Sequence, residues 1–164
     1  MKKTGDIEVV ALTSRYQDWA RQLICERWGS AAIVTRGIVH RADRAPGFVA
    51  LAGGSPQGLL THQTTDGDCE ILTLNSLLEG RGIGRALIAA VREFASAQKF
   101  RRVWLITTND NTAALRFYQM QGFQLTAIYR DVVKESRKLK PEIPEKGLDG
   151  IAIRDEIELE LQLR

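Results

Sequence analysis

The residues of this chain whose spacing points most directly to chemistry are the glycines of the stretch Cys69–Ala90, which reads CEILTLNSLLEGRGIGRALIAA. A β-prone run leads into Gly80, Gly82 and Gly84, and a helical pattern begins at Arg85. Three glycines within five residues let the backbone approach a ligand closely. The helix that follows directs free N–H groups and the positive end of its dipole into the turn. A strand, turn and helix of this kind is suited to binding phosphate.

The identity of the phosphate ligand depends on the motif, and two common motifs do not fit. The dinucleotide fingerprint G-x-G-x-x-G would need a glycine at Leu87, and no Gly-Lys-Ser/Thr follows as a P-loop requires. The turn instead resembles the pyrophosphate loop of the acetyl-CoA-dependent N-acetyltransferase (GNAT) superfamily, Gln/Arg-x-x-Gly-x-Gly/Ala, at Glu79, Gly80, Arg81, Gly82, Ile83 and Gly84. Glu79 departs from the family's Gln or Arg and adds repulsion, although backbone amides do most of the binding. A glycine turn that binds nothing is the plain alternative.

A later segment, NTAALRFYQMQGF, strengthens the resemblance. Asn111, Ala114 and Tyr118 fall on one helix face and precede a Gly-Phe pair, as in the family. The resemblance implies that Asn111 contacts the pantetheine arm or the acceptor, and that Tyr118 reaches the CoA sulfur as the catalytic acid. The alternatives are that Asn111 only caps the helix and that Tyr118 is only a core aromatic. The full cofactor-binding set implied by the resemblance is Leu72, Leu74, Glu79, Gly80, Arg81, Gly82, Ile83, Gly84, Arg85, Asn111, Ala114 and Tyr118.

The reaction that the resemblance implies is direct attack of a primary amine on acetyl-CoA, a co-substrate, within a ternary complex. The amine must be neutral, the oxyanion needs a donor and the thiolate needs a proton. In the family the strand before the glycine loop is splayed, which frees backbone N–H groups near Leu74 for the acetyl carbonyl. We expect Glu70 to be the base, because strand alternation places it on one face with Leu72 and Leu74, two residues after Asp68. A solvated carboxylate at a strand start is the alternative.

Periodicity and turn signals predict the elements that position these residues. The expected helices are Arg15–Trp28, begun by a capping box of Ser14 and Gln17 and ended by Gly29; Ile83–Gln98; a helix through about Met120; and a short one around Val133–Leu139. The run Asn109-Asp110-Asn111-Thr112 offers several possible N-caps for the third of these helices. The expected strands are Asp6–Leu12, Gly47–Gly53, Gly58–Thr65, Cys69–Ser76, Arg102–Thr108, Phe123–Arg130 and Asp155–Leu163. Ala31–His40 is expected to be an irregular loop or short strand. The order implies an α/β (α+β) GNAT-like fold: one domain over 1–164, with a mixed, mainly antiparallel twisted sheet of about seven strands flanked by helices.

The C-terminal part holds two further expectations. In the last strand, Ile157, Leu159, Leu161 and Leu163 should point inward, and Glu156, Glu158 and Glu160 outward. The long connection 132–154 before it carries a Pro-Glu-Ile-Pro corner and several apolar residues, which predicts packing rather than disorder. We expect it to fold over the acceptor side of the cleft. A surface excursion or a dimer contact is the alternative.

Composition bounds the remaining possibilities. The chain has 164 residues and a net charge of +3, and its arginines are enriched only around the glycine loop and its helix. Neither nucleic acid nor a membrane is expected as a partner, and the start Met1-Lys2-Lys3 lacks a signal-peptide pattern, which favours the cytoplasm. Two cysteines and two histidines in unrelated segments predict no metal site. The acceptor is then a small-molecule amine or a protein amino group, and a homodimer stays open. The competing functions are a non-catalytic acyl-CoA-binding or regulatory domain and a module for another nucleotide.

Overall fold

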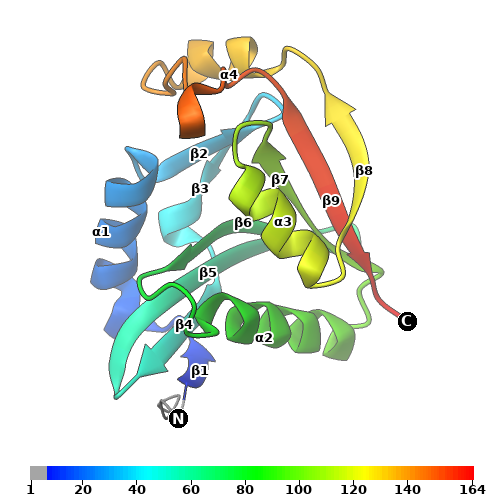
Figure 1. Cartoon of the computed structure of the whole chain (residues 1–164). Coiled ribbons are helices and arrows are strands. Elements are labelled where there is room, and N and C mark those ends of the chain that lie inside the picture. Colours follow the sequence, from blue (N-terminus) through cyan, green and yellow to red (C-terminus); the bar gives the residue numbers. More distant parts are fainter. Residues whose placement is uncertain (1–6) are drawn as a thin grey trace.

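The architecture is a seven-stranded sheet, given by a computed structural model that describes residues 7–164. Its strands, in spatial order, are β1 (Ile7–Ala11), β4 (Gly47–Ala52), β5 (Ser55–Thr65), β6 (Asp68–Ser76), β7 (Arg102–Thr108), β9 (Glu156–Gln162) and β8 (Gln124–Tyr129). β6 and β7 pair in parallel, and all other neighbours are antiparallel. The predicted fold class is therefore confirmed (Figure 1).

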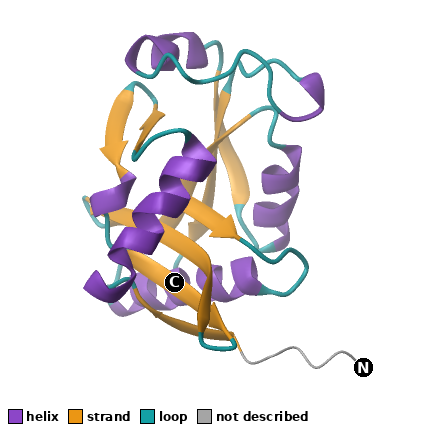
Figure 2. Cartoon of the chain, turned by 90° about the vertical axis from the view of Figure 1, so that its left-hand side faces the viewer, coloured by secondary structure: helices purple, strands orange, loops and turns teal. Residues whose placement is uncertain are grey.

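Helices cover both faces of this sheet (Figure 2). One hydrophobic cluster lies under α2 (Ile83–Ala97) and α3 (Thr112–Met120), and a second lies under α1 (Gln17–Trp28). The region from 31 to 40, expected to be irregular, forms a hairpin of β2 (Ala32–Thr35) and β3 (Ile38–Arg41) with its turn at Arg36-Gly37. The long connection contains α4 (Val133–Leu139), with the bounds that the sequence predicted. Among residues 7–164, no helix is long and apolar enough to cross a membrane.

The pairing of β6 with β7 stops halfway along β6. The parallel register runs only from Asp68↔Arg102 to Ile71↔Leu105. Beyond this point β6 continues alongside β5, and β7 continues alongside β9. The two central strands therefore diverge and leave an open edge on the second half of β6.

A β-bulge in β6 changes which side chains share a face. His62 of β5 pairs with Ile71 and Thr61 pairs with Thr73, so Leu72 is the extra residue. Leu72 packs in the cluster under α1, whereas Leu74 packs against the cluster under α2. The expectation that Leu72 and Leu74 lie on one face is wrong, because a bulge shifts strand alternation by one residue.

The last strand also departs from its pattern. The inward apolar residues pack as expected, but Glu156 and Glu158 are only 2% and 6% exposed instead of pointing into solvent. The turn of the β2–β3 hairpin covers them: the Arg36 backbone N–H donates to Glu156 Oε2 at 2.8 Å, and the Arg36 guanidinium lies 3.9 Å from Glu158. The hairpin turn at Arg36, 120 residues away in sequence, therefore buries the Glu156 side chain that strand alternation predicts to be exposed.

Of the two signals that predicted the bounds of α1, the one for its end is confirmed and the one for its start is wrong. Gly29 ends α1 in the left-handed conformation, as predicted. The capping box is wrong: Ser14 lies in a 3₁₀ turn, no side-chain cap bond forms, and the Gln17 amide donates to the Asp43 carbonyl instead. Asp6, the first residue of the predicted first strand, and the start Met1-Lys2-Lys3 lie outside the described residues.

Candidate active site

The glycine turn and the first turn of α2 present unpaired backbone donors. Gly82 is the N-cap of α2 in the left-handed conformation, with φ 82°, and no side chain caps the helix. The first bond into the helix runs from the Ala86 N–H to the Gly82 carbonyl, so the amides of Ile83, Gly84 and Arg85 have no backbone acceptor in the described part of the chain. These amides and the positive end of the α2 dipole form a site suited to an anion.

Gly84 has a second role in the fold. A Cβ placed on it would lie 3.1 Å from Cζ of Phe117, which belongs to α3. The missing side chain therefore lets α3 pack closely against the start of α2. The other members of the turn, Glu79, Gly80, Arg81 and Gly82, are exposed.

The open edge of β6 lies beside this turn. The Leu77 N–H donates to the Gln57 carbonyl of the neighbouring β5. Because N–H groups alternate along a strand, those of Asn75 and Thr73 point the same way, and the Leu74 N–H points into the gap left by β7. The sequence expectation of a free N–H near Leu74 agrees with this geometry.

Two residues predicted to be functional belong to α3 and its N-cap, which is Asn111. The Asn111 side chain accepts a hydrogen bond from the Ala114 N–H at 3.1 Å, so it does cap the helix, and it also lines the pocket described next. Tyr118 is 7% exposed and packs edge-on against Phe117 and Phe123, at centroid distances of 5.2 and 5.4 Å. Burial raises the pKa of its hydroxyl, which therefore stays protonated at neutral pH.

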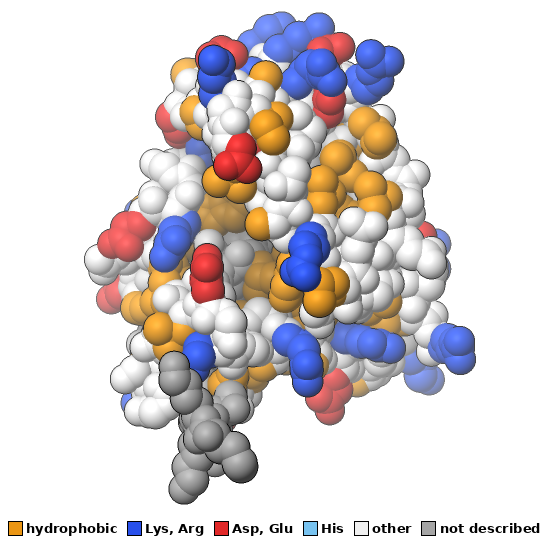
Figure 3. All heavy atoms as spheres, in the orientation of Figure 1, with side chains coloured by type: hydrophobic (Ala, Val, Ile, Leu, Met, Phe, Trp, Pro, Cys, Tyr) orange, Lys and Arg blue, Asp and Glu red, His pale blue; other side chains and the backbone are white. Residues whose placement is uncertain are grey.

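A pocket of about 390 Å³ is lined by the part of β7 that no longer pairs with β6, Ile106–Thr108. Figure 3 shows a hollow with a hydrophobic floor between α1 and α3, below α4. The apolar lining residues come from five segments and are Trp28, Ile33, Val34, Ile106, Val133, Ile143, Pro144 and Ile153. The polar and charged lining residues are Arg27, Thr35, Thr107, Thr108, Asn111, Ser136, Lys140, Glu142 and Glu156. Trp28 also reaches β6, since its indole N–H donates to Asn75 Oδ1 at 3.3 Å.

The long connection forms one wall of this pocket, which agrees with its expected packing. Lys140 fixes that wall: its ammonium donates to the carbonyls of Trp28 and Ala32 at 2.6 and 2.8 Å. Arg137 ties α4 to the later part of the connection by donating to the carbonyls of Ile143, Pro144 and Ile153. The connection is thus an ordered part of the cleft.

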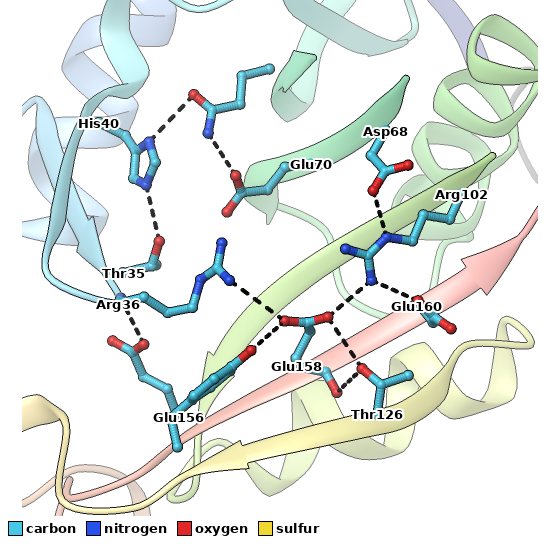
Figure 4. Close-up of polar contacts among 12 residues, drawn as sticks. Thr35, Arg36, His40, Asp68, Glu70, Arg102, Thr126, Glu156, Glu158 and Glu160 are labelled. Carbon is cyan, nitrogen blue, oxygen red and sulfur yellow. Dashed lines mark hydrogen bonds and ion pairs between the residues drawn. The ribbon is translucent and has the colours of Figure 1, made fainter. Parts of the chain in front are cut away.

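A chain of polar contacts separates Glu70 from the pocket (Figure 4). Glu70 is 5% exposed and accepts from the Gln63 amide at 2.6 Å; the Gln63 oxygen lies 3.3 Å from His40 Nδ1, and His40 Nε2 lies 3.0 Å from Thr35 Oγ1. Because Gln63 donates to Glu70, its oxygen faces His40 and favours the proton on Nδ1. Thr35 lines the pocket, whereas Glu70 does not.

Glu156 is the carboxylate that the sequence reasoning missed. It lines the pocket floor, and burial raises its pKa, with a smaller contribution from the nearby Glu70. Strand alternation assigned it to solvent, and only its contact with the distant hairpin shows otherwise. Its neighbour Glu158 is different, because Arg102, Tyr129 and Thr126 all donate to it.

Comparison with known proteins assigns the chain to a family. The model of the Acetyltransferase (GNAT) family matches residues 12–123. The chain belongs to this family. YdhI of Bacillus subtilis (strain 168) is 42% identical to this GNAT acetyltransferase over 133 residues, covering 80% of this chain and 83% of YdhI. A mycothiol acetyltransferase of Gordonia bronchialis is 32% identical over 116 residues, covering 67% of this chain but 35% of that protein.

Solved structures agree with this assignment at the level of the fold. The IAA acetyltransferase from Bacillus cereus ATCC 14579 superposes with a TM-score of 0.73 and 24% identity, covering 96% of this chain and all of the other. A GNAT family acetyltransferase from Elizabethkingia anophelis, solved with acetyl-CoA bound, gives a TM-score of 0.68 and 21% identity, covering 96% and 98%. The predicted family and enzyme class, acetyltransferase, are confirmed. Within residues 7–164, no three His, Cys, Asp or Glu side chains are grouped so that they could hold a metal ion.

Proposed function

We propose that this GNAT acetyltransferase transfers the acetyl group of acetyl-CoA to a primary amine by direct attack within a ternary complex. The observation that carries the proposal is the divergence of β6 and β7 after Ile71 and Leu105. It leaves the Leu74 N–H free beside the glycine turn, with a pocket large enough for an acceptor on the far side. A thioester bound between the diverging strands β6 and β7 would be accessible both to the Leu74 N–H and to an acceptor in the pocket.

The fit of acetyl-CoA rests on this chain's own groups. The unpaired amides of Ile83, Gly84 and Arg85 would hold the pyrophosphate, assisted by the exposed Arg81 and Arg85 side chains. The pantetheine arm would then run past Leu72, Leu74, Asn111 and Ala114, and the Leu74 N–H would polarise the acetyl carbonyl. Glu79 and Gly80 complete the turn, and the Glu79 carboxylate would weaken binding through repulsion.

The chemistry needs two proton transfers. The amine nitrogen forms a bond to the acetyl carbon, the C–S bond breaks, and the departing sulfur takes a proton from Tyr118. The amine proton leaves on the pocket side, where Thr35 and His40 Nε2 can accept it. Glu70 would act through Gln63 as a positioning residue that fixes the tautomer of His40, rather than touching the amine.

Two measurements in sequence test the proposal. Calorimetry should detect acetyl-CoA binding, and a thiol-release assay with panels of polyamines, amino acids, alkyl amines and peptides should reveal at least one acetylated amine. Acetyl-CoA binding without acetyl transfer to any amine would favour a non-catalytic acyl-CoA-binding domain instead.

A further inference from the structure

The floor of the pocket holds a buried carboxylate whose charge is only partly matched. Glu156 Oε2 accepts the Arg36 backbone N–H, and in the described part of the chain no donor bonds to Oε1. The Arg36 guanidinium turns instead to Glu158 and to the faces of Trp104 and Tyr129. The Arg36 charge and the Ser136 hydroxyl act to lower the pKa of Glu156, but burial outweighs them and raises it, so a cation that joined this carboxylate would stabilise its charge.

A second unpartnered group lies beside this carboxylate. Ser136 of α4 is 1% exposed, lines the same pocket and influences the pKa of Glu156 as a nearby donor. Its Oγ nevertheless has no partner in hydrogen-bonding geometry among the described residues. Hydroxyls buried in this way usually have a partner, and here that partner is either the Glu156 carboxylate or an atom of a bound ligand.

The other charged side chains that line the pocket do not pair with the Glu156 carboxylate. Lys140 is committed to two backbone carbonyls, and Arg27 and Glu142 are exposed. Around the polar floor the walls are apolar, from Trp28 and Ile33 on one side to Ile143 and Ile153 on the other. A second charge on the ligand would therefore lose its hydration against hydrophobic side chains.

We propose that the pocket takes a primary amine on an uncharged, apolar body, with the ammonium on Glu156 and Ser136. This inference rests on the proposed acetyl transfer and names its acceptor class. The apolar body would fill the space between Trp28 and the connection. The pocket volume of about 390 Å³ is sufficient for an alkyl or aryl group. A docked ammonium can lose its proton to the same carboxylate. Polyamines should bind less well, because their additional ammonium groups would lose hydration against the apolar walls. Free amino acids should bind less well, because their carboxylate would be repelled by that of Glu156.

A matched ligand series tests the proposal without any mutation. Calorimetry with the full chain saturated with CoA would compare n-hexylamine, hexamethylenediamine, ε-aminocaproate and n-hexanol, which share one chain length. We expect n-hexylamine to bind about tenfold more tightly than each of the others, since only it combines one ammonium with an apolar tail. Equal or tighter binding of the diamine, the amino acid or the alcohol would overturn the proposal.

A pair of isosteric variants locates the anchor. Glu156→Gln can still accept the Arg36 N–H but lacks the charge, and should weaken n-hexylamine about tenfold while leaving n-hexanol unchanged. Glu145→Gln, at an exposed carboxylate of the same connection outside the pocket, is the matched control and should change neither. Equal losses in both variants, or none in Glu156→Gln, would overturn the assignment.

Thiol release measured with acetyl-CoA in place of CoA, on the same amines and variants, separates this inference from the proposed function. Acetyl transfer to n-hexylamine, lost in Glu156→Gln, supports both. Acetyl transfer to hexamethylenediamine or a peptide but not to n-hexylamine would overturn the acceptor class and leave acetyl transfer standing. Tight n-hexylamine binding without thiol release from acetyl-CoA in the presence of any amine would refute acetyl transfer and leave the pocket assignment standing.

Discussion

Replacing Tyr118 with phenylalanine removes one oxygen from the proposed acid and changes little else. The ring is 7% exposed and is held edge-on by Phe117 and Phe123, contacts that phenylalanine keeps. No protein group in the described part of the chain hydrogen-bonds the hydroxyl, so its loss leaves no partner unsatisfied. We therefore expect the free energy of unfolding to change by less than about 1 kcal/mol.

Catalysis should respond very differently. Because burial keeps the hydroxyl protonated, it can donate to the departing sulfur, and losing a positioned acid typically lowers kcat by about 10²–10⁴. That range corresponds to about 2.7–5.5 kcal/mol of activation free energy. Acetyl-CoA affinity should hardly change, because the hydroxyl acts on the leaving group. Denaturant unfolding, calorimetry and steady-state thiol release with an acetylated amine measure the three quantities.

Tyr129→Phe is the matched control, with the opposite expectation. The Tyr129 hydroxyl donates to Glu158 at 2.8 Å and is outside the pocket. Its removal should cost about 1–2 kcal/mol of stability, because buried Glu158 loses a donor, and should leave kcat within about twofold. Unchanged kcat in Tyr118→Phe, or an equal loss of kcat in both variants, would refute the assignment of Tyr118 as the acid.

Three further predictions test the loop, the connection and the core. Gly84→Val should weaken acetyl-CoA binding at least about tenfold by calorimetry, and adding Phe117→Leu to relieve the close contact should not restore it; restored binding would mean that only packing was disturbed. Lys140→Met leaves two carbonyls without their donor and should raise the acceptor KM while acetyl-CoA affinity stays the same; an unchanged KM would remove this wall of the pocket from acceptor binding. Burial lowers the pKa of His62, so its neutral form is favoured in the fold and its contribution to stability is lost as pH falls below about 6.5, by at most about 1.4 kcal/mol per pH unit. His62→Phe should therefore show a shallower loss of stability between about pH 7 and pH 5 in denaturant titrations, and equal slopes would contradict this cause.

The sequence by itself determined the features that depend on a few neighbouring residues. The bounds of β7 and α4, the glycine that ends α1, and the turn before α2 all follow from periodicity or from glycines that adopt positive φ. Resemblance in Gly82, Gly84, Asn111 and Tyr118 was enough to indicate the family. These signals survive because backbone propensity and helix capping act over a turn or two of chain.

Tertiary structure alone decided how the pocket is built and which carboxylate faces it. The bulge at Leu72 depends on the register between β5 and β6, which alternation within β6 does not contain. Glu156 is buried because the hairpin turn at Arg36 folds onto it, and Glu70 is held away from the pocket by Gln63 and His40. A pattern within one strand predicts two faces, but burial and hydrogen-bond partners depend on segments that lie far away in the chain.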